Sequence, residues 1–550
     1  MQNVNIFALG GQDENGKNCY VLEHNNDIYI INTGVKVPIE SNNGVDTLIP
    51  DFSYLIKYKD RIKGVFITDI KNESFSALPW LLMKIPNLQI YTSSFNRVMV
   101  LERISKYGID QKSYRVNTLR GKTKIGSLDV IPFALTGSMP GNTGFNFSTP
   151  EGDYIFMFNY VEGDLGIYGK TSFKALAQYF ANHKIIALVT DAGKSNVVGR
   201  AIDKYKTNVT LEQAFNATDA NNRIIVGAYG EEMVAIQEVI TLARKYNRPI
   251  IPYGKTYADL LYLISKLSDK IQLPEIVDYK SINKHPNAVI LVTASTERLY
   301  NRFVRIVNNN DVYLKLQPQD TVVLMAPPVN GLESNYAEMM DMVAKITPNI
   351  FEVLDNDYFY IRPTKQDLCN LVKELNPRYF IPTQGLYRYL VGSSEYIASE
   401  LGKKHQPDSI VLLNGKIAHF QNDKLFSHNG KVKEVGTTII DGFGVGDISA
   451  EVIAEREALG REGVIIINGL YSPKTKKILG QLHINYIGVI DESEVEETDK
   501  LIMDIILEIL KTKTFTSMRE VNEKIRKTIR KKIFKLKDKD PMIALTLTTV

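Results

Sequence analysis

The sequence predicts an α/β protein with more than one domain. At 550 residues the chain is too long for one compact core, and two to four domains are expected. Short apolar strands alternate with helical segments, as in the strand expected at 65–67 and the helix expected at 75–83. A glycine-rich joint at residues 439–447 then separates a last block of strands and helices.

The elements follow in order. Residues 1–35 are predicted to form strands around an Asn25-Asn26 turn, and further apolar strands follow at 63–69, 88–92, 128–135, 153–160 and 184–193. A short helix is expected from Thr210. Strands at 223–230, 248–254, 288–296 and 320–328, with a helix at 231–247, predict a parallel sheet. Residues 358–385 again read strand–helix–strand.

In the last block, strands are expected at 462–472, 485–491 and 542–550, and an amphipathic helix at 499–510. Val521, Ile525, Ile529 and Ile533 recur every four residues and predict a second helix with one apolar stripe. Its other faces carry Lys524, Arg526, Lys527, Arg530, Lys531 and Lys532.

Composition narrows the class of protein. Hydrophobic residues make up 44% and charged residues 23%, which is typical of globular proteins. No apolar run reaches the ~18 residues of a membrane span, and the first residues lack a signal-peptide pattern. The two cysteines, Cys19 and Cys369, are too few for a disulfide framework or a cysteine-based zinc site. We therefore expect a cytoplasmic protein without membrane contact.

The charge is uneven along the chain. Net charge is +4, yet residues 500–550 hold 13 lysines and arginines against 6 acidic residues. This basic tail is either a solvated helix face or a contact for an anionic partner such as RNA.

Eight segments, taken in order, resemble one family: ALGGQDENGKNCYVLE, GVDTLIPDFSYL, LVTDAG, RIIVGAYG, VTASTERLYNRFVRI, PRYFIPTQGLYRYL, DGFGVGDISAEVIAERE and DPMIALTLTTV. The family is bacterial ribonuclease J, of the metallo-β-lactamase/β-CASP class of RNA nucleases. The resemblance covers nearly the whole chain. The last two segments are the most specific to ribonuclease J within the class.

The resemblance implies an αββα metallo-β-lactamase sandwich with an inserted β-CASP domain and a small α+β C-terminal domain. The implied parts are the first lactamase part (1–205), the β-CASP domain (206–355), the second lactamase part (356–438), a linker (439–455) and the C-terminal domain (456–550). In such enzymes RNA passes between the lactamase and β-CASP domains, and two metal ions activate the attacking water. Family members are 5′-to-3′ exonucleases with some endonuclease activity, and form dimers or tetramers through the C-terminal domain.

The residues that would hold those metals are missing. The family's first motif is H-x-H-x-D-H, and its four ligand positions fall here on Asp69, Lys71, Glu73 and Ser74. The remaining ligand positions fall on Gly137, Tyr160, Arg362 and Gln384. None of the seven histidines lies in a motif, and no two have ligand spacing. We expect no catalytic residues and no cofactor at these positions.

A replacement metal site is the alternative. Asp69 and Glu73, with Asp164 and Asp191 near the same strand ends, could hold magnesium or manganese through carboxylates. Zinc is not expected. However, Lys71 and Arg362 would place two positive charges among those carboxylates and leave little attraction for a divalent ion. The favoured hypothesis is that Lys71 and Arg362 pair with Asp69 and Glu73 and occupy the space of the metals.

The β-CASP side also departs from the family. Its T-G-S-Q-G-E segment, part of the phosphate-recognition region, is replaced by residues 293–298, and the glycines that allow close backbone approach are absent. Arg298 could contact a phosphate or form a surface salt bridge, and the salt bridge is favoured. With Lys524, Arg526, Lys527, Arg530 and Lys531, it completes the RNA-contact candidates.

Three functions remain open, and whether the chain is an enzyme is undecided. The first is a catalytically inactive ribonuclease J-like protein of RNA processing and decay, acting as a partner or RNA-binding subunit of an active ribonuclease J. The second is an active exo- and endoribonuclease with a rebuilt, histidine-free metal site. The third is a structural or regulatory protein that no longer binds RNA.

Overall fold

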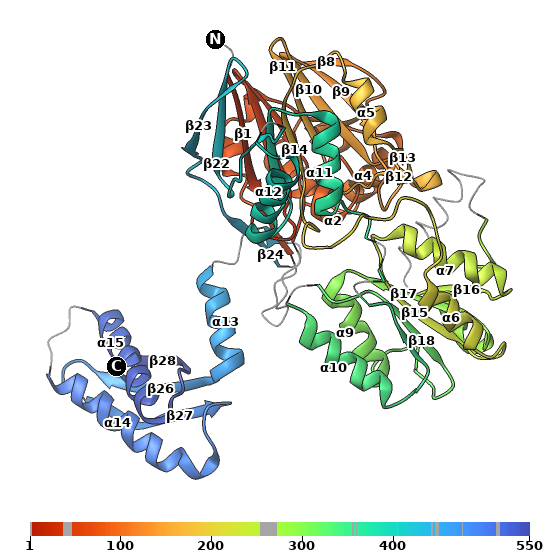
Figure 1. The fold of residues 1–550 in the computed structure, drawn as a ribbon. Helices are drawn as coiled ribbons and strands as arrows, with labels where there is room; N and C mark the ends of the chain where they lie inside the picture. Colours follow the sequence, from red (N-terminus) through yellow and green to blue (C-terminus); the bar gives the residue numbers. More distant parts are fainter. Residues whose placement is uncertain are drawn as a thin grey trace. The chain divides into compact units, whose positions relative to one another are not determined.

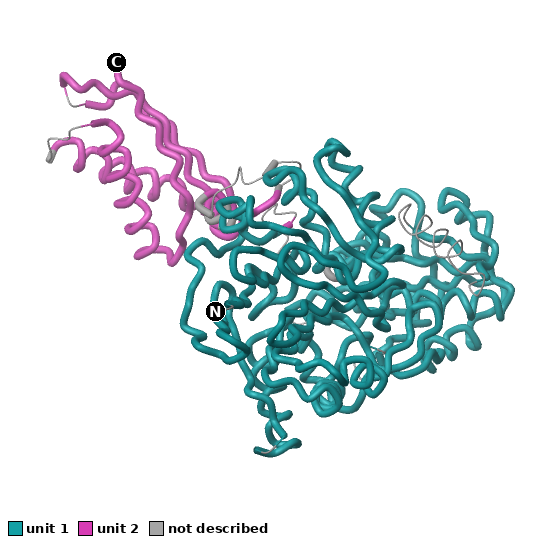
Figure 2. Tube along the Cα trace, turned by 90° about the horizontal axis from the view of Figure 1, so that it is seen from above, with its two compact units in different colours: residues 1–39, 48–438 teal, residues 40–47, 439–550 magenta. Residues whose placement is uncertain are grey.

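The structure, a computed structural model, describes most of the chain: residues 3–36, 47–253, 272–329, 331–354, 357–358, 360–403, 405–441, 444–445, 450–475, 477–512 and 517–550. It divides into two compact units (Figure 2). The first comprises residues 1–39 and 48–438, and the second comprises residues 40–47 and 439–550. Part of the glycine-rich joint predicted at 439–447 lies outside the described residues.

Two sheets form the first part of unit 1. One has the order β23-β22-β1-β2-β3-β5-β6-β7 and the other the order β21-β20-β14-β11-β10-β9-β8. The strands of the first are β1 (Asn3–Gly10), β2 (Cys19–His24), β3 (Asp27–Ile31), β5 (Ile62–Phe66), β6 (Leu88–Thr92), β7 (Tyr114–Thr118), β22 (Lys416–Gln421) and β23 (Lys424–Lys431). Those of the second are β8 (Thr123–Ile125), β9 (Leu128–Ala134), β10 (Thr143–Thr149), β11 (Gly152–Met157), β14 (Ile185–Asp191), β20 (Tyr379–Thr383) and β21 (Asp408–Ser409).

The core between these sheets is rich in aromatic side chains. Tyr29 and Phe66 of the first sheet pack against Phe147 of the second with ring centroids 5.6 and 5.0 Å apart, at steep angles. Helices α5 (Phe173–Tyr179), α11 (Lys365–Leu375) and α12 (Tyr387–Leu401) cover the outer face of the second sheet. Helix α4 (Ser94–Ser105) contacts β7 of the first. Figure 1 shows this layered sandwich, as the fold class predicts.

A third sheet carries the inserted domain. Its strands β15 (Ile224–Tyr229), β16 (Ile250–Tyr253), β17 (Val289–Ala294), β18 (Thr321–Met325) and β19 (Ile350–Glu352) run parallel in the order β16-β17-β15-β18-β19. The strands read as nearly continuous apolar runs because helices cover a parallel sheet on both faces. The helices are α6 (Val209–Ala217), α7 (Met233–Lys245), α9 (Thr296–Val307) and α10 (Glu333–Ala344). The parallel sheet predicted for this part of the chain is confirmed.

Unit 2 has its own apolar core. Strand β26 (Val464–Ser472) pairs antiparallel with β27 (Lys477–Ile487) and parallel with β28 (Met542–Thr549). Helices α14 (Val495–Thr512) and α15 (Met518–Lys537) pack on this sheet. The predicted stripe of α15 is confirmed, since Val521, Ile525, Ile529 and Ile533 are all buried.

One predicted helix is interrupted. Instead of a single run over 75–83, the chain forms α2 (Asn72–Phe75) and α3 (Leu78–Lys84). The break has two causes. The backbone N–H of Ala77 donates to the carbonyl of Thr33 rather than within a helix, and Pro79 has no N–H to donate.

Within the described part of the chain, no helix is long and apolar enough to span a bilayer.

Candidate active site

The loop that follows β5 is built around Asp69. This buried carboxylate accepts hydrogen bonds from the Thr68 hydroxyl at 2.8 Å, the Lys71 backbone N–H at 3.0 Å, and Ser74 Oγ and Asn159 Nδ2 at 3.1 Å. Burial raises the pKa of Asp69 despite these donors. The bonds hold the loop in shape, so the lone pairs of Asp69 are engaged by the protein itself.

Lys71 lies on the same loop and reaches across to the β-CASP domain. Its ammonium is 2.7 Å from Glu232 Oε1, and its side chain is 8% exposed. Burial alone would lower the pKa of Lys71, but the carboxylates of Glu232 and Glu73 outweigh it and raise the pKa. The expected side-chain pair with Asp69 is therefore wrong. A carboxylate from another domain lies closer, and Asp69 receives only the backbone N–H of Lys71.

Arg362 forms the centre of the second ion pair. Its Nε is 2.8 Å from Asp191 Oδ2, and its Nη2 is 3.2 Å from Asp191 Oδ1, which makes a bidentate contact. Nη2 is also 3.0 Å from Gln384 Oε1 and 3.5 Å from Glu73 Oε1. Burial opposes the charge, yet Asp191 and Glu73 raise the pKa of Arg362. The expected pairing of Arg362 with Glu73 is confirmed, and Asp191 is its shorter contact.

Two strand ends bring these groups together. Asp191 ends β14 and also accepts from the Gly193 backbone N–H at 2.8 Å. Gln384 follows β20 with a φ of 60°. The two backbones approach so closely that a Cβ at Gly193 would lie 2.3 Å from the Gln384 carbonyl oxygen. Glycine at 193 is therefore required for the contact of Arg362 with both Asp191 and Gln384.

The other ligand positions are closed by packing. Gly137 donates its N–H to the Tyr168 carbonyl at 3.0 Å. Tyr160 is fully buried, with its hydroxyl 2.7 Å from Thr190 Oγ1. The preceding residue, Asn159, has a φ of 53°, and its side-chain amide donates to Asp69. Ser74 is buried and bonded to Asp69.

Asp164 does not join the group. It lies on the short strand β12 (Gly163–Asp164), where it pairs with Lys170 at 3.4 Å and accepts from the Gly166 N–H at 3.1 Å. Its side chain is 54% exposed. The expectation that Asp164 and Asp191 share one strand end is therefore wrong, because β12 belongs to a separate two-stranded sheet.

Two further carboxylates in the site were not predicted from the sequence. Glu231 and Glu232 precede α7, about 160 positions from the loop that they contact. The Glu231 side chain accepts from the Asn72 backbone N–H at 2.9 Å, and its own carbonyl accepts from Ser138 Oγ at 2.9 Å. Burial raises the pKa of Glu231 to about 7.

This donor set does not fit a pair of catalytic metal ions. A hydrolytic metal needs several imidazole or carboxylate ligands and an open position for water. Here Glu232, Asp191 and Glu73 are bonded to Lys71 or Arg362, and Asp69 is enclosed by its loop. Across the described ranges, no group of three or more histidine, cysteine, aspartate and glutamate side chains is arranged to hold a metal.

The proposed RNA contacts lie elsewhere. Arg298 is an exposed residue of α9. On α15, Arg526 donates to the Leu545 carbonyl at 3.1 Å, Lys527 pairs with Glu523 at 2.6 Å and Arg530 pairs with Asp540. Lys524 and Lys531 are exposed on the same helix.

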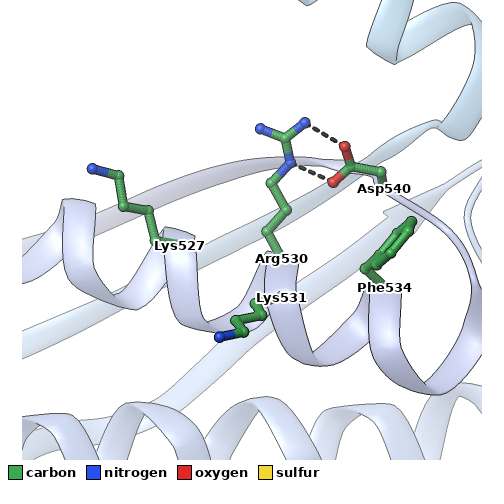
Figure 3. A pocket seen from close by; sticks show the side chains of 5 residues that line it. All are labelled: Lys527, Arg530, Lys531, Phe534 and Asp540. Atoms are coloured by element: carbon green, nitrogen blue, oxygen red, sulfur yellow. Dashed lines mark hydrogen bonds and ion pairs between the residues drawn. The ribbon is translucent and has the colours of Figure 1, made fainter.

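A hollow of about 310 Å³ lies on this helix. Figure 3 shows that Arg530 turns toward Asp540, whereas Lys527 and Lys531 point away from it. Phe534, 54% exposed, lines the same hollow. The hollow is therefore lined mainly by cationic side chains and by one aromatic ring.

Comparison with known proteins agrees with this architecture. Residues 221–343 match the model of the ribonuclease J β-CASP domain, and residues 451–550 match that of the ribonuclease J C-terminal domain. The chain is 28% identical to an uncharacterized protein of Mycoplasma genitalium, over all of both chains. It is 27% identical to ribonuclease J2 of Bacillus subtilis, covering 93% of this chain and 92% of that one. It is 24% identical to ribonuclease J 2 of Streptococcus pyogenes, over 99% of both chains.

A solved structure is also similar in fold. A protein of unknown function from Enterococcus faecalis covers 76% of this chain with a TM-score of 0.50 and 12% identity. The matched domains and the full-length relatives lead to one conclusion: residues 221–343 and 451–550 are ribonuclease J domains, and the chain is similar to ribonuclease J2 proteins over nearly its whole length.

Proposed function

We propose that this chain is a catalytically inactive member of the ribonuclease J family and acts in RNA processing and decay as a partner or RNA-binding subunit of an active ribonuclease J. The cytoplasm is its proposed place of action. One observation carries the proposal: at the strand ends where the family places its metal ligands, Arg362 bridges Asp191 and Glu73. A guanidinium at this place repels a divalent cation and occupies the carboxylates that would attract one.

A second contact supports the same reading. Lys71 comes from the lactamase part and Glu232 from the β-CASP part, and their side chains are 8% and 17% exposed. Buried charges of this kind are stable only when they are paired. The pair thus connects the two sides of the cleft without an ion, and an RNA strand passing there would have to break it.

The test has two measurements on the purified full-length chain. Incubated alone with 5′-monophosphorylated RNA and manganese or magnesium, the chain is expected to leave the RNA intact. Mixed with an active ribonuclease J from the same cell, it is expected to elute with that enzyme in size-exclusion chromatography. An Asp69→Asn, Glu73→Gln variant serves as the matched control for the cleavage assay.

Two results would overturn the proposal. Cleavage by the natural chain that the Asp69→Asn, Glu73→Gln variant loses would identify a rebuilt, histidine-free metal site. Failure to bind both RNA and an active ribonuclease J would leave a structural or regulatory protein outside RNA metabolism.

A further inference from the structure

A pocket lined by residues that follow Asp191 and Arg362 in the sequence has the chemistry of a nucleotide site. Its volume is about 500 Å³, within the range of small-ligand sites in proteins. The loop after β14 contributes Ser195, the first turn of α11 contributes Lys365, and α12 contributes Arg388, Tyr389 and Tyr396. Helices α11 and α12 lie side by side in Figure 1 and contact one another. The pocket is therefore built from three segments of one unit.

The aromatic and cationic side chains of the pocket are paired with each other. The Lys365 ammonium lies 5.1 Å from the centroid of the Tyr396 ring, and the Arg388 guanidinium lies 5.0 Å from that of Tyr389. Arg388 also donates to the Tyr389 hydroxyl at 3.1 Å. Cation–π contacts of this kind place a positive charge over the face of each ring.

The wall of the pocket is fixed in place. Ser195 is buried, and its hydroxyl donates to the Tyr389 carbonyl at 2.8 Å, which ties the loop to α12. Of the charged residues that line the pocket, Lys365 and Arg388 are positive and Glu395 is negative. The pocket therefore favours an anion, and its two tyrosines favour a planar one.

The pocket residues lie close in sequence to the residues of the Arg362 ion pair. Lys365 follows Arg362 by three positions, and Ser195 follows Asp191 by four. The segments that form the central ion pair of the cleft thus continue directly into the pocket. A strand bound in the pocket would lie beside the ion pairs without breaking them.

We propose that this pocket binds a nucleotide of single-stranded RNA, with the base against the tyrosine rings and the phosphate at Arg388 and Lys365. The inference rests on the proposed RNA-binding role and names where that role is performed in unit 1. Stacking on aromatic rings combined with cationic contacts to phosphate is how proteins bind single strands without reading their sequence. An acidic peptide would use the same cations but would gain little from the two rings.

The test is fluorescence anisotropy of the full-length chain with a labelled 20-nucleotide single-stranded RNA of mixed sequence. Tyr396→Leu is expected to weaken binding roughly tenfold, and Tyr396→Phe to retain it, because stacking needs only the ring. Lys365→Gln with Arg388→Gln should reduce the salt slope by about 1.4, as expected when two phosphate contacts are lost. Glu395→Gln should strengthen binding, a gain that misfolding cannot produce.

A matched control separates the pocket from general charge. Lys112→Gln with Arg115→Gln removes the same charge from exposed residues at β7, the edge strand of the other sheet, and should leave binding unchanged. Competition with free nucleoside monophosphates and with tripolyphosphate distinguishes the possible ligands. Neither competitor is expected to displace the RNA when the competitor is present at a concentration near the Kd of the RNA.

Four outcomes would overturn the inference. An equal loss of affinity in the control would mean that binding is unspecific, and unchanged binding in the pocket variants would place the RNA elsewhere. Efficient displacement by a nucleoside monophosphate would indicate a site for free nucleotides, and displacement by tripolyphosphate a site for any polyanion, an acidic peptide included. If the natural chain binds no RNA at all, it is the proposed RNA-binding role that fails, which distinguishes the two failures.

Discussion

Arg362 contacts three side chains from three separate segments of the chain: Asp191 at the end of β14, Glu73 in the short helix α2 and Gln384 after β20. Asp191 is fully buried, and the Arg362 side chain is 16% exposed. Removing one member of a buried ion pair is costly because the other charge is left without a partner in a medium that solvates it poorly.

Arg362→Met is therefore expected to lower the free energy of unfolding by roughly 3–5 kcal/mol. The double variant Arg362→Met, Asp191→Asn should recover part of this loss, because the buried carboxylate of Asp191 is then no longer present without a partner. Urea unfolding followed by circular dichroism measures both. Lys527→Met, which breaks an exposed pair with Glu523, is the control and should leave the midpoint unchanged. Equal midpoints for Arg362→Met and the natural chain would contradict the buried network.

Some contacts of these residues could be predicted from the sequence, and others could not. The family motif placed Asp69, Lys71 and Arg362 in one site, and the contact of Arg362 with Glu73 followed from charge alone. Glu232 could not be found in this way, since its distance from Lys71 in the sequence is 161 positions and only the docking of α7 brings it there. Asn159 was missed because its contact with Asp69 joins two residues 90 positions apart in the sequence.

At the scale of elements, helix α7 contributes a buried carboxylate to its neighbour α6. Glu238 lies on α7, and its Oε2 accepts from the backbone N–H of Asn208, the N-cap residue of α6. Burial raises the pKa of Glu238 to about 8, against a usual value of 4.5. Folding is therefore coupled to proton uptake at this helix end.

Stability is expected to fall as the pH rises from about 5 to 8. In this range the folded chain keeps a proton on Glu238 that the unfolded chain has released, so each step up in pH favours the unfolded state. Glu238→Gln should flatten the profile, because an amide accepts the same hydrogen bond without titrating. Thermal melts between pH 5 and 8.5 measure the effect. Glu231, with a pKa of about 7, has the same sign and accounts for a remaining slope. Identical profiles for the variant and the natural chain would contradict this coupling.

A core substitution on α15 is expected to destabilise unit 2 alone. Ile529 is fully buried in the core of that unit, and Ile529→Ala should cost about 2–5 kcal/mol. Hydrogen exchange followed by mass spectrometry should show faster exchange in α14 and β28, with unit 1 unchanged. Lys524→Ala, on the exposed face of the same helix, is the matched control. Unchanged protection of β28 in the Ile529 variant would contradict the assigned core.

Element type was largely predictable, and boundaries were less so. The period of four in α15 and the apolar runs of the parallel sheet carry their own signals, and both are present as expected. The break between α2 and α3 had a local cue in Pro79, but its main cause is the carbonyl of Thr33, which is distant in sequence. Periodicity within a window contains no information about such a contact.

At the scale of the whole molecule, we propose that the cationic helix α15 of unit 2 contacts RNA in addition to the proposed pocket in unit 1. Lys524→Gln with Lys531→Gln is expected to weaken binding of single-stranded RNA and to lower the salt slope by about 1.4, since two phosphate contacts are removed. Lys527→Gln, whose ammonium is already paired with Glu523, should have a smaller effect. RNA affinity is measured at several salt concentrations for the natural chain, the double variant and Lys527→Gln. An unchanged salt slope in the double variant would show that Lys524 and Lys531 of α15 do not contact RNA.

The whole molecule combines a two-sheet sandwich with the β-CASP and C-terminal domains of a nuclease family, and it carries ion pairs at Lys71 and Arg362. The fold persists because its cores are apolar and do not depend on the ligands.

The most direct test of the proposed inactivity is the manganese content of the purified full-length chain after equilibration with the ion, measured together with cleavage of 5′-monophosphorylated RNA in the same sample. The structure predicts less than stoichiometric metal and intact RNA. One or more tightly bound ions per chain, with cleavage that Asp69→Asn or Glu73→Gln abolishes, would contradict it.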